Sequence, residues 1–261
     1  MLQGADRPMP LDLKGLRVAI SAGAGGIGGV MAASFAACGA QVFVCDIDAG
    51  ALAATPHPSV RAVVGEPSEA EAFIDAAVAA LGGLDVLVNN AGIAGPTARV
   101  EDVAPEDLTR TLRIDVESMF HCTRRAIPAL RAAGGGSIVN ISSAAGRFGY
   151  PLRSPYATAK WGVVGFTKSL SIELGPDRIR ANAILPGLVA GDRIRRVIEA
   201  KAQAKGVAFA VEEAAYLSRT SLNSYVTQHD IANMALYLAS PFGATISGQA
   251  IAIDADMQVL G

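Results

Sequence analysis

The segment Ser21-Ala22-Gly23-Ala24-Gly25-Gly26-Ile27-Gly28 joins a short apolar run, 16–21, to a helical pattern at 27–38. Glycines at such a junction let backbone N–H groups approach a pyrophosphate, and the N-terminus of a helix favours negative charge. Asp46 follows about 20 residues later, at the end of the next apolar run, where a carboxylate can accept hydrogen bonds from an adenosine ribose. The segment therefore predicts the first half of a dinucleotide-binding α/β fold.

Strand and helix patterns alternate along the rest of the chain. Further strands are expected at 41–46, 60–64, 84–89, 137–142, 180–185 and 249–253, and long helices at 69–81, 105–131 and 156–174. Continuous apolar strands alternating with helices predict a parallel sheet covered on both faces. We expect one α/β domain over residues 1–261, a Rossmann-type doubly wound sheet of about seven strands. Segment 188–227 has helical pieces but no strand, which favours a lid.

Composition narrows the class of protein. Half of the 261 residues are apolar (51%) and 18% are charged, so a large core can be buried. With a net charge of −2 and no run of Lys or Arg, nucleic acid is not an expected partner. Residues 1–10 contain no apolar signal core and no apolar window reaches the length of a membrane span, which predicts a cytoplasmic location. Cys38, Cys45 and Cys122 lack metal-ligand spacing, so we expect buried thiols and no metal site.

A second group of motifs lies in the middle of the chain, where Ser142-Ser143 precede Tyr156-Ala157-Thr158-Ala159-Lys160. Tyr156 and Lys160 are four residues apart and share one face of a helix. A free phenol titrates near pH 10, and an ammonium group beside it stabilises the phenolate. A hydroxyl nearby can hold a substrate oxygen. Such a pair by itself is most often a surface pair, but the surrounding motifs favour proton transfer to or from an alcohol oxygen.

The order of these motifs resembles the short-chain dehydrogenase/reductase family in its shorter, single-domain form. Asn89-Asn90-Ala91-Gly92 after the fourth expected strand and Pro186-Gly187 after the sixth complete the pattern, which covers roughly residues 13 to 254. The resemblance implies the strand order 3-2-1-4-5-6-7 and a nicotinamide cofactor across the carboxyl ends of the strands. It also implies a homo-oligomer, a tetramer or dimer, that packs through the helices at 105–131 and 156–174.

The resemblance also implies roles for individual residues. Tyr156 would be the general acid/base, Lys160 would stabilise its phenolate and bind the nicotinamide ribose, and Ser143 would orient the substrate oxygen. Ser143 is preferred to Ser142 because it lies thirteen residues before Tyr156. The residues expected to hold the cofactor are Ser21, Gly23, Gly26, Ile27, Gly28, Asp46, Ile47, Glu66, Asn90, Ala91, Gly92, Tyr156, Lys160, Pro186, Gly187 and Val189.

Asp46 also predicts which dinucleotide binds. A carboxylate about 4 Å from a 2′-phosphate is repelled by about 4 kcal/mol at a near-surface effective dielectric. No Lys or Arg occurs in the Gly-rich turn or immediately after Asp46 to reverse this. The expected cofactor is therefore NAD rather than NADP.

Four positions depart from the family pattern. Ala22 stands where the family has Gly, so that glycine is displaced to Gly23 or absent, and the loop path is in question. Glu66, followed by Pro67, replaces an Asp, and Gly191 lies near the usual place of a Thr. Asp115 replaces an Asn that kinks its helix and holds a water near Lys160. A carboxylate accepts the same hydrogen bonds but cannot donate as an amide does, so we expect a modified proton relay.

Basic residues near the motifs bear on the substrate. Arg153, or an arginine of the lid segment, is a candidate for holding an anionic or polyhydroxylated substrate. Alternatively, the cations of this region (Arg147, Arg153, Arg193, Arg195, Arg196, Lys201 and Lys205) are solvated or pair with acids such as Asp192, Glu199, Glu212 and Glu213.

The expected activity is an NAD-dependent interconversion of a secondary alcohol and a ketone, the alcohol being a sugar, polyol, hydroxy acid or cyclic alcohol. One alternative is a carbonyl reductase resembling the 3-oxoacyl-carrier-protein reductases, which usually use NADPH and have a basic residue in the Gly-rich turn. The other is an NAD-binding sensor or scaffold without turnover, suggested by Ala22, Asp115 and Gly191.

Overall fold

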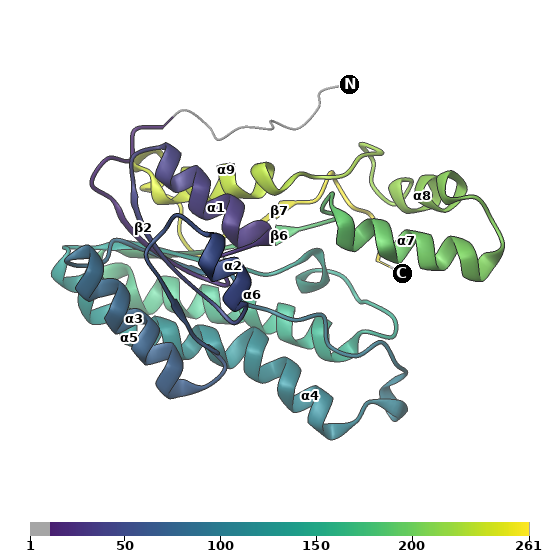
Figure 1. Cartoon of the computed structure of the whole chain (residues 1–261), viewed down its shortest axis with the longest axis horizontal. Coiled ribbons are helices and arrows are strands. Elements are labelled where there is room, and N and C mark those ends of the chain that lie inside the picture. The colour runs from purple at the N-terminus through teal and green to yellow at the C-terminus, as the bar shows by residue number, and fades with distance from the viewer. Residues whose placement is uncertain (1–10, 261) are drawn as a thin grey trace.

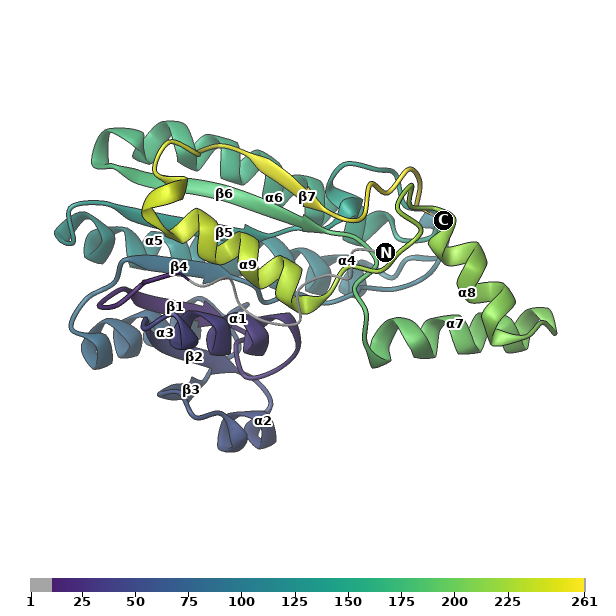
Figure 2. The same ribbon diagram turned by 90° about the horizontal axis from the view of Figure 1, so that it is seen from above.

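A seven-stranded parallel sheet forms the centre of the molecule (Figures 1 and 2), in a computed structural model that describes residues 11–260. The strands are β1 Arg17–Ser21, β2 Gln41–Asp46, β3 Ser59–Arg61, β4 Val86–Asn89, β5 Gly136–Ile141, β6 Ile179–Pro186 and β7 Ala250–Ile253. Their spatial order, β3-β2-β1-β4-β5-β6-β7, confirms the predicted order. Because every neighbouring pair is parallel, the carboxyl ends of all strands lie at one edge, called here the carboxyl edge.

Helices cover both faces of the sheet (Figure 2). The helices are α1 Gly26–Ala37, α2 Ala49–Ala54, α3 Pro67–Leu81, α4 Pro105–Leu112, α5 Ser118–Ala132, α6 Ser154–Leu174, α7 Asp192–Lys205, α8 Phe209–Leu217 and α9 Gln228–Ala239. Side chains of β1 alternate between the faces: Val18 and Ile20 pack in the core under α1 and α9, whereas Ala19 packs in the core under α3, α5 and α6. No helix among residues 11–260 is long and apolar enough to cross a membrane.

The structure adds details that the periodicity does not predict. Helix α9 was not expected, although Thr227 and Asp230 form a capping box at its start, which is a local signal in the sequence. The helix expected at 105–131 consists of α4, a π-helical turn at Arg113–Glu117, and α5. The third strand is shorter than the expected 60–64 and begins one residue earlier.

Helices α7 and α8 form a hairpin that projects beyond the carboxyl edge (Figures 1 and 2). Two isolated β-bridges hold its base, one between Val189 and Val226 and one between Thr220 and Met257. The hairpin therefore lies over the edge of the sheet where the predicted site residues are found.

Candidate active site

Two motifs that are distant in sequence are bound to each other at the carboxyl edge. The Ser21 hydroxyl, at the end of β1, accepts hydrogen bonds from the backbone N–H groups of Asn90 and Ala91 at 3.0 and 3.1 Å. In return, the Asn90 side-chain amide donates to the carbonyl oxygens of Ser21 and Ala22 at 3.1 and 3.0 Å. The Gly-rich turn and the loop after β4 are thus one connected structure.

The Gly-rich turn keeps a left-handed bend although the family's glycine is absent. Ala22 has a φ of +50°, a region that costs a residue with a Cβ roughly 1–2 kcal/mol. The bend is therefore at Ala22 itself and is not displaced to Gly23, whose φ is not positive.

The start of α1 provides room for a phosphate group. At Gly28 a Cβ would lie 2.0 Å from the Ala22 carbonyl oxygen, so the backbone approaches too closely for any side chain. Gly26 and Ile27 form the first turn of α1, and around Gly25 and Gly26 there is open space where side chains would otherwise lie. Gly28 therefore lets α1 pack closely on the Gly-rich turn, and the open space around Gly25 and Gly26 at the N-terminus of this helix fits a pyrophosphate.

Asp46, at the end of β2, faces this turn. One carboxylate oxygen accepts a hydrogen bond from the Ala24 N–H at 3.2 Å, and the other accepts from the N–H groups of Ile47 and Asp48 at 2.8 and 3.2 Å. The Ile47 side chain is exposed. No Lys or Arg among the described side chains forms an ion pair with Asp46, so its negative charge is available to ribose hydroxyls.

Glu66, expected near the adenine, already has a partner. Its carboxylate forms an ion pair with Arg113, whose Nε also donates to the Gly65 carbonyl oxygen at 3.1 Å. Arg113 begins the π-helical turn that contains Asp115. No local signal in the sequence points to this contact, because the two residues are far apart along the chain.

The predicted acid/base pair lies on α6. Tyr156 is half-buried and Lys160 is 4% exposed, and the Lys160 Nζ lies 5.6 Å from the centre of the Tyr156 ring. Nζ also donates to the Ile141 carbonyl oxygen at the end of β5, at 3.2 Å. A buried cation is thus held beside the phenol by the helix and the sheet together.

The two serines after β5 have different environments. The Ser142 hydroxyl is buried and donates to the Lys160 carbonyl oxygen at 2.8 Å, which binds β5 to α6. The Ser143 hydroxyl accepts from the Ala145 N–H at 3.1 Å, so its proton remains available for donation. This arrangement favours Ser143 as the residue that meets a substrate oxygen.

Asp115 forms a direct ion pair with Lys160. It is fully buried in the π-helical turn, with its Oδ2 3.4 Å from the Lys160 Nζ, and its Oδ1 accepts from the Ile93 N–H at 2.7 Å. Gly92 leaves room for this pair, because a Cβ there would lie 3.2 Å from Nζ and 3.4 Å from Oδ1. The residue that departs from the family pattern therefore touches the predicted catalytic lysine.

The turn after β6 approaches the end of β7. Gly187 donates its N–H to the Ile253 carbonyl oxygen at 3.0 Å, and a Cβ at Gly187 would lie 2.5 Å from that of Asp254. Pro186 is the last residue of β6, and Val189 forms the bridge at the base of the hairpin. Asp254 is buried and pairs with Arg147 at 3.0 Å. We did not predict Asp254, although a polar residue directly after a strand of a parallel sheet points to this edge.

Three of the cations considered for substrate binding have carboxylate partners. Arg147 pairs with Asp254, Arg195 with Glu199 at 2.9 Å, and Lys205 with Glu212 at 2.7 Å, as the alternative interpretation expected. Arg153, at the start of α6, has no carboxylate partner among the described residues. Arg153 therefore differs from these paired cations in keeping its charge available for a ligand.

The cysteines lie in the core. All three are buried, and burial raises the pKa of the Cys122 thiol to about 12 and that of Cys45 well above its usual value. Thiolates are the reactive form of cysteine. These side chains therefore act as small apolar groups.

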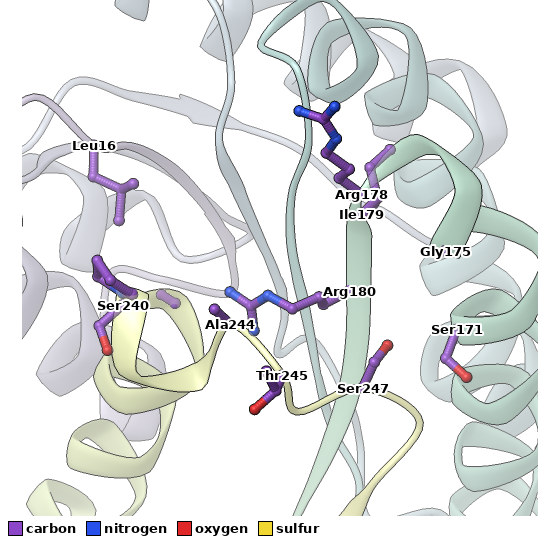
Figure 3. Close-up of a pocket in the computed structure, with 12 residues that line it drawn as sticks. Leu16, Ser171, Gly175, Arg178, Ile179, Arg180, Ser240, Ala244, Thr245 and Ser247 are labelled. Atoms are coloured by element: carbon purple, nitrogen blue, oxygen red, sulfur yellow. The ribbon is translucent and has the colours of Figure 1, made fainter.

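A large cavity is found at the opposite edge of the sheet from these residues. It measures about 620 Å³ and lies between the C-terminal end of α6, the start of β6 and the segment after α9. Arg180 points across it toward Ala244 (Figure 3), and desolvation lowers the pKa of this guanidinium. No predicted site residue lines this cavity, so it is separate from the candidate active site.

The parallel sheet carries a Gly-rich turn after β1, an acid at the end of β2, a Ser after β5 and a Tyr and Lys on α6. Together these features define a dinucleotide-binding fold equipped for proton transfer. The chain belongs to the short-chain dehydrogenase/reductase family. A family model described as enoyl-(acyl carrier protein) reductase matches residues 22–257.

Individual relatives agree with this assignment. The chain is 35% identical to a probable galactose dehydrogenase of Rhizobium meliloti, over 93% of this chain and 95% of that protein. It resembles the crystal structure of an NAD⁺-bound xylitol dehydrogenase (TM-score 0.85, 25% identity, 92% and 98% of the chains). It also resembles the crystal structure of an actinorhodin polyketide ketoreductase variant with NADPH (TM-score 0.86, 30% identity, 93% and 97%). These likenesses support an oxidoreductase that uses a nicotinamide cofactor and a small-molecule substrate.

Proposed function

We propose that this protein is an NAD-dependent oxidoreductase that interconverts a secondary alcohol and a ketone. The observation that carries the proposal is the buried Lys160 beside Tyr156, with Ser143 presented by the adjacent loop. The substrate class extends over sugars, polyols, hydroxy acids and cyclic alcohols.

In the oxidising direction, Tyr156 as phenolate accepts the hydroxyl proton of the alcohol. The Lys160 ammonium stabilises that phenolate, and the Ser143 hydroxyl donates a hydrogen bond to the substrate oxygen. NAD, once bound, would supply the hydride acceptor, so that one alcohol and one NAD⁺ would give one ketone, one NADH and one proton. Asp115 holds Lys160 in place by the ion pair and replaces the amide of the family pattern in a modified relay.

Several groups of residues would hold the dinucleotide. We assign the pyrophosphate to the turn from Ser21 to Gly28, the adenosine to Asp46, Ile47 and Glu66, and the nicotinamide side to Pro186, Gly187 and Val189. Asn90, Ala91 and Gly92 would line the groove between them, and Tyr156 and Lys160 would meet the nicotinamide ribose. The carboxylate of Asp46 supports NAD over NADP, since a 2′-phosphate nearby would be repelled by about 4 kcal/mol.

The same proposal extends to the surroundings of the site. We assign the α7–α8 hairpin, within 188–227, the role of a lid, and we expect a cytoplasmic homotetramer or dimer. Exposed aromatic side chains on the outer faces of α5 and α6, Phe120 and Trp161, support packing between subunits.

Binding and turnover together test the proposal. Calorimetry with NAD and NADP, followed by an NADH-absorbance screen of secondary alcohols, should show preference for NAD and turnover of some alcohol. A preference for NADPH with ketone reduction would favour the carbonyl reductase alternative instead. NAD binding without turnover across the panel would favour the sensor alternative, and failure to bind either dinucleotide would contradict the whole assignment.

A further inference from the structure

Arg153 is aimed at the reaction centre by an unusual piece of backbone. Leu152, just before it, has a φ of +62°, the left-handed region that favours glycine, and its carbonyl oxygen accepts from the Ala98 N–H at 2.9 Å. Arg153 then forms the N-cap of α6, and its Nη2 donates to the Ala94 carbonyl oxygen at 2.6 Å. Strained backbone of this kind clusters at active sites and ligand-binding sites.

The guanidinium group lies directly beside Tyr156. Its central carbon is 5.4 Å from the centre of the Tyr156 ring and 5.4 Å from that of Tyr150. The hydrogen bond to Ala94 is the one hydrogen bond that the Arg153 side chain forms with the described residues. The buried Arg153 Nε–H has no acceptor among the described residues. A partly buried cation with an unused N–H group is a place where a negative ligand is stabilised.

The neighbouring arginine provides the contrast. Arg147 lies in the same loop, but Asp254 and the Met257 carbonyl oxygen already neutralise and bind its guanidinium. Of the two arginines described in this loop, only Arg153 therefore keeps an uncompensated charge. A single guanidinium matches the charge and the planar fork of one carboxylate.

We propose that Arg153 binds a carboxylate of the substrate, so that the alcohols this enzyme oxidises are hydroxy acids and its ketone products are keto acids. The inference rests on the proposed oxidoreductase function. The carboxylate would replace the missing counter-charge of Arg153, and the carbon bearing the hydroxyl would then lie toward Tyr156 and Ser143.

Matched substrates and variants test this assignment. The wild type, Arg153→Met and Arg153→Lys are assayed with C4–C8 hydroxy acids and with the corresponding primary amides. We expect the wild type to prefer the acids, and Arg153→Met to lower kcat/KM for acids by roughly 10²-fold, mainly through KM, with the amides changed less than about threefold. Arg153→Lys should recover part of the loss. Arg131→Met, which removes an exposed arginine paired with Asp177 on the surface, should leave both substrate sets unchanged.

Other outcomes overturn the inference. An equal loss of kcat/KM for acids and amides, with a shifted pH–rate profile, would mean that Arg153 acts through Tyr156. Lys160 also faces Tyr156, and Asp115 lies behind Lys160. A wild type that prefers neutral alcohols would overturn the carboxylate clamp and leave the oxidoreductase proposal intact.

A binding measurement keeps the two proposals separate if no alcohol is turned over. Calorimetry of saturated C4–C8 carboxylic acids with the NADH-loaded wild type and the NADH-loaded Arg153→Met variant then decides. Binding lost selectively in the variant supports the clamp independently of the oxidoreductase proposal. Equal binding to both proteins, or none to the wild type, overturns the clamp as well.

Discussion

The ion pairs of the reaction centre and of the α7–α8 hairpin differ in burial and in the number of elements that hold them. Lys160 and Asp115 are almost completely buried, and groups from β5, α6, the π-helical turn and the loop after β4 fix them together. In the hairpin, the Arg195–Glu199 and Lys205–Glu212 pairs join residues of the hairpin itself, and both cations are more than half exposed. The sheet therefore imposes the geometry of the reaction centre. For the hairpin, which we proposed above as a lid, we expect local opening that leaves the core intact.

The largest effect on activity is expected from removing the acid/base group of the reaction centre. Tyr156→Phe deletes the group that exchanges the proton, so kcat should fall by about 10²–10⁴-fold, while NAD affinity changes little. NADH absorbance measures the first quantity and calorimetry the second. Retained turnover in this variant would remove Tyr156 from the mechanism.

The charge of Asp115 should have the next largest effect. In Asp115→Asn a negative charge next to Lys160 is lost, so the ammonium stabilises the Tyr156 phenolate more strongly. The acidic limb of the pH–rate profile for alcohol oxidation should move to lower pH by about 0.5–1 unit. Profiles of variant and wild type that superimpose would show that this charge plays no part in the relay.

Loosening the hairpin should affect substrate binding more than chemistry. Lys205→Met leaves the buried Glu212 carboxylate without its cation, so hydrogen exchange should rise across 192–217 but not in α6, and KM should rise a few-fold with kcat retained. The control is Arg195→Met, which breaks a pair in which both side chains are well exposed and should cost less than about 0.5 kcal/mol. An equal rise of exchange in α6 would contradict the independence of the hairpin.

The smallest effect, on stability alone, should come from relieving backbone strain in the Gly-rich turn. Ala22→Gly removes the Cβ from a left-handed residue, and after the greater entropy of glycine in the unfolded chain is subtracted, about 0.5–1 kcal/mol of stability should remain. Tm should rise by roughly 1–4 °C. The matched change Ala24→Gly, at a residue without a positive φ, should instead lower Tm. A lower Tm for Ala22→Gly would mean that the bend is not strained.

Much of the fold followed from local patterns. The alternating apolar runs predicted the strands of a parallel sheet, and the resemblance to the family predicted their order, which the structure confirms. Helix α9 was missed because much of its support comes from packing on α1 in the folded core. The Glu66–Arg113 pair was also missed, since it joins segments that no periodicity relates.

Arg147 and Arg153 show what local sequence patterns could not predict about this protein. The chain by itself determined the Gly-rich turn, the acid at the end of β2 and the Tyr156–Lys160 pair, because glycine conformation and helix spacing are local properties of adjacent residues. Both arginines lie in one loop, and although the sequence offered Arg153 as a candidate for binding the substrate, it did not show which of the two has a partner. Only the tertiary structure showed this, by bringing Asp254 from the far end of the chain to Arg147 and leaving Arg153 beside Tyr156 without a carboxylate among the described residues. Charge pairing acts through space and depends on which groups the fold buries together.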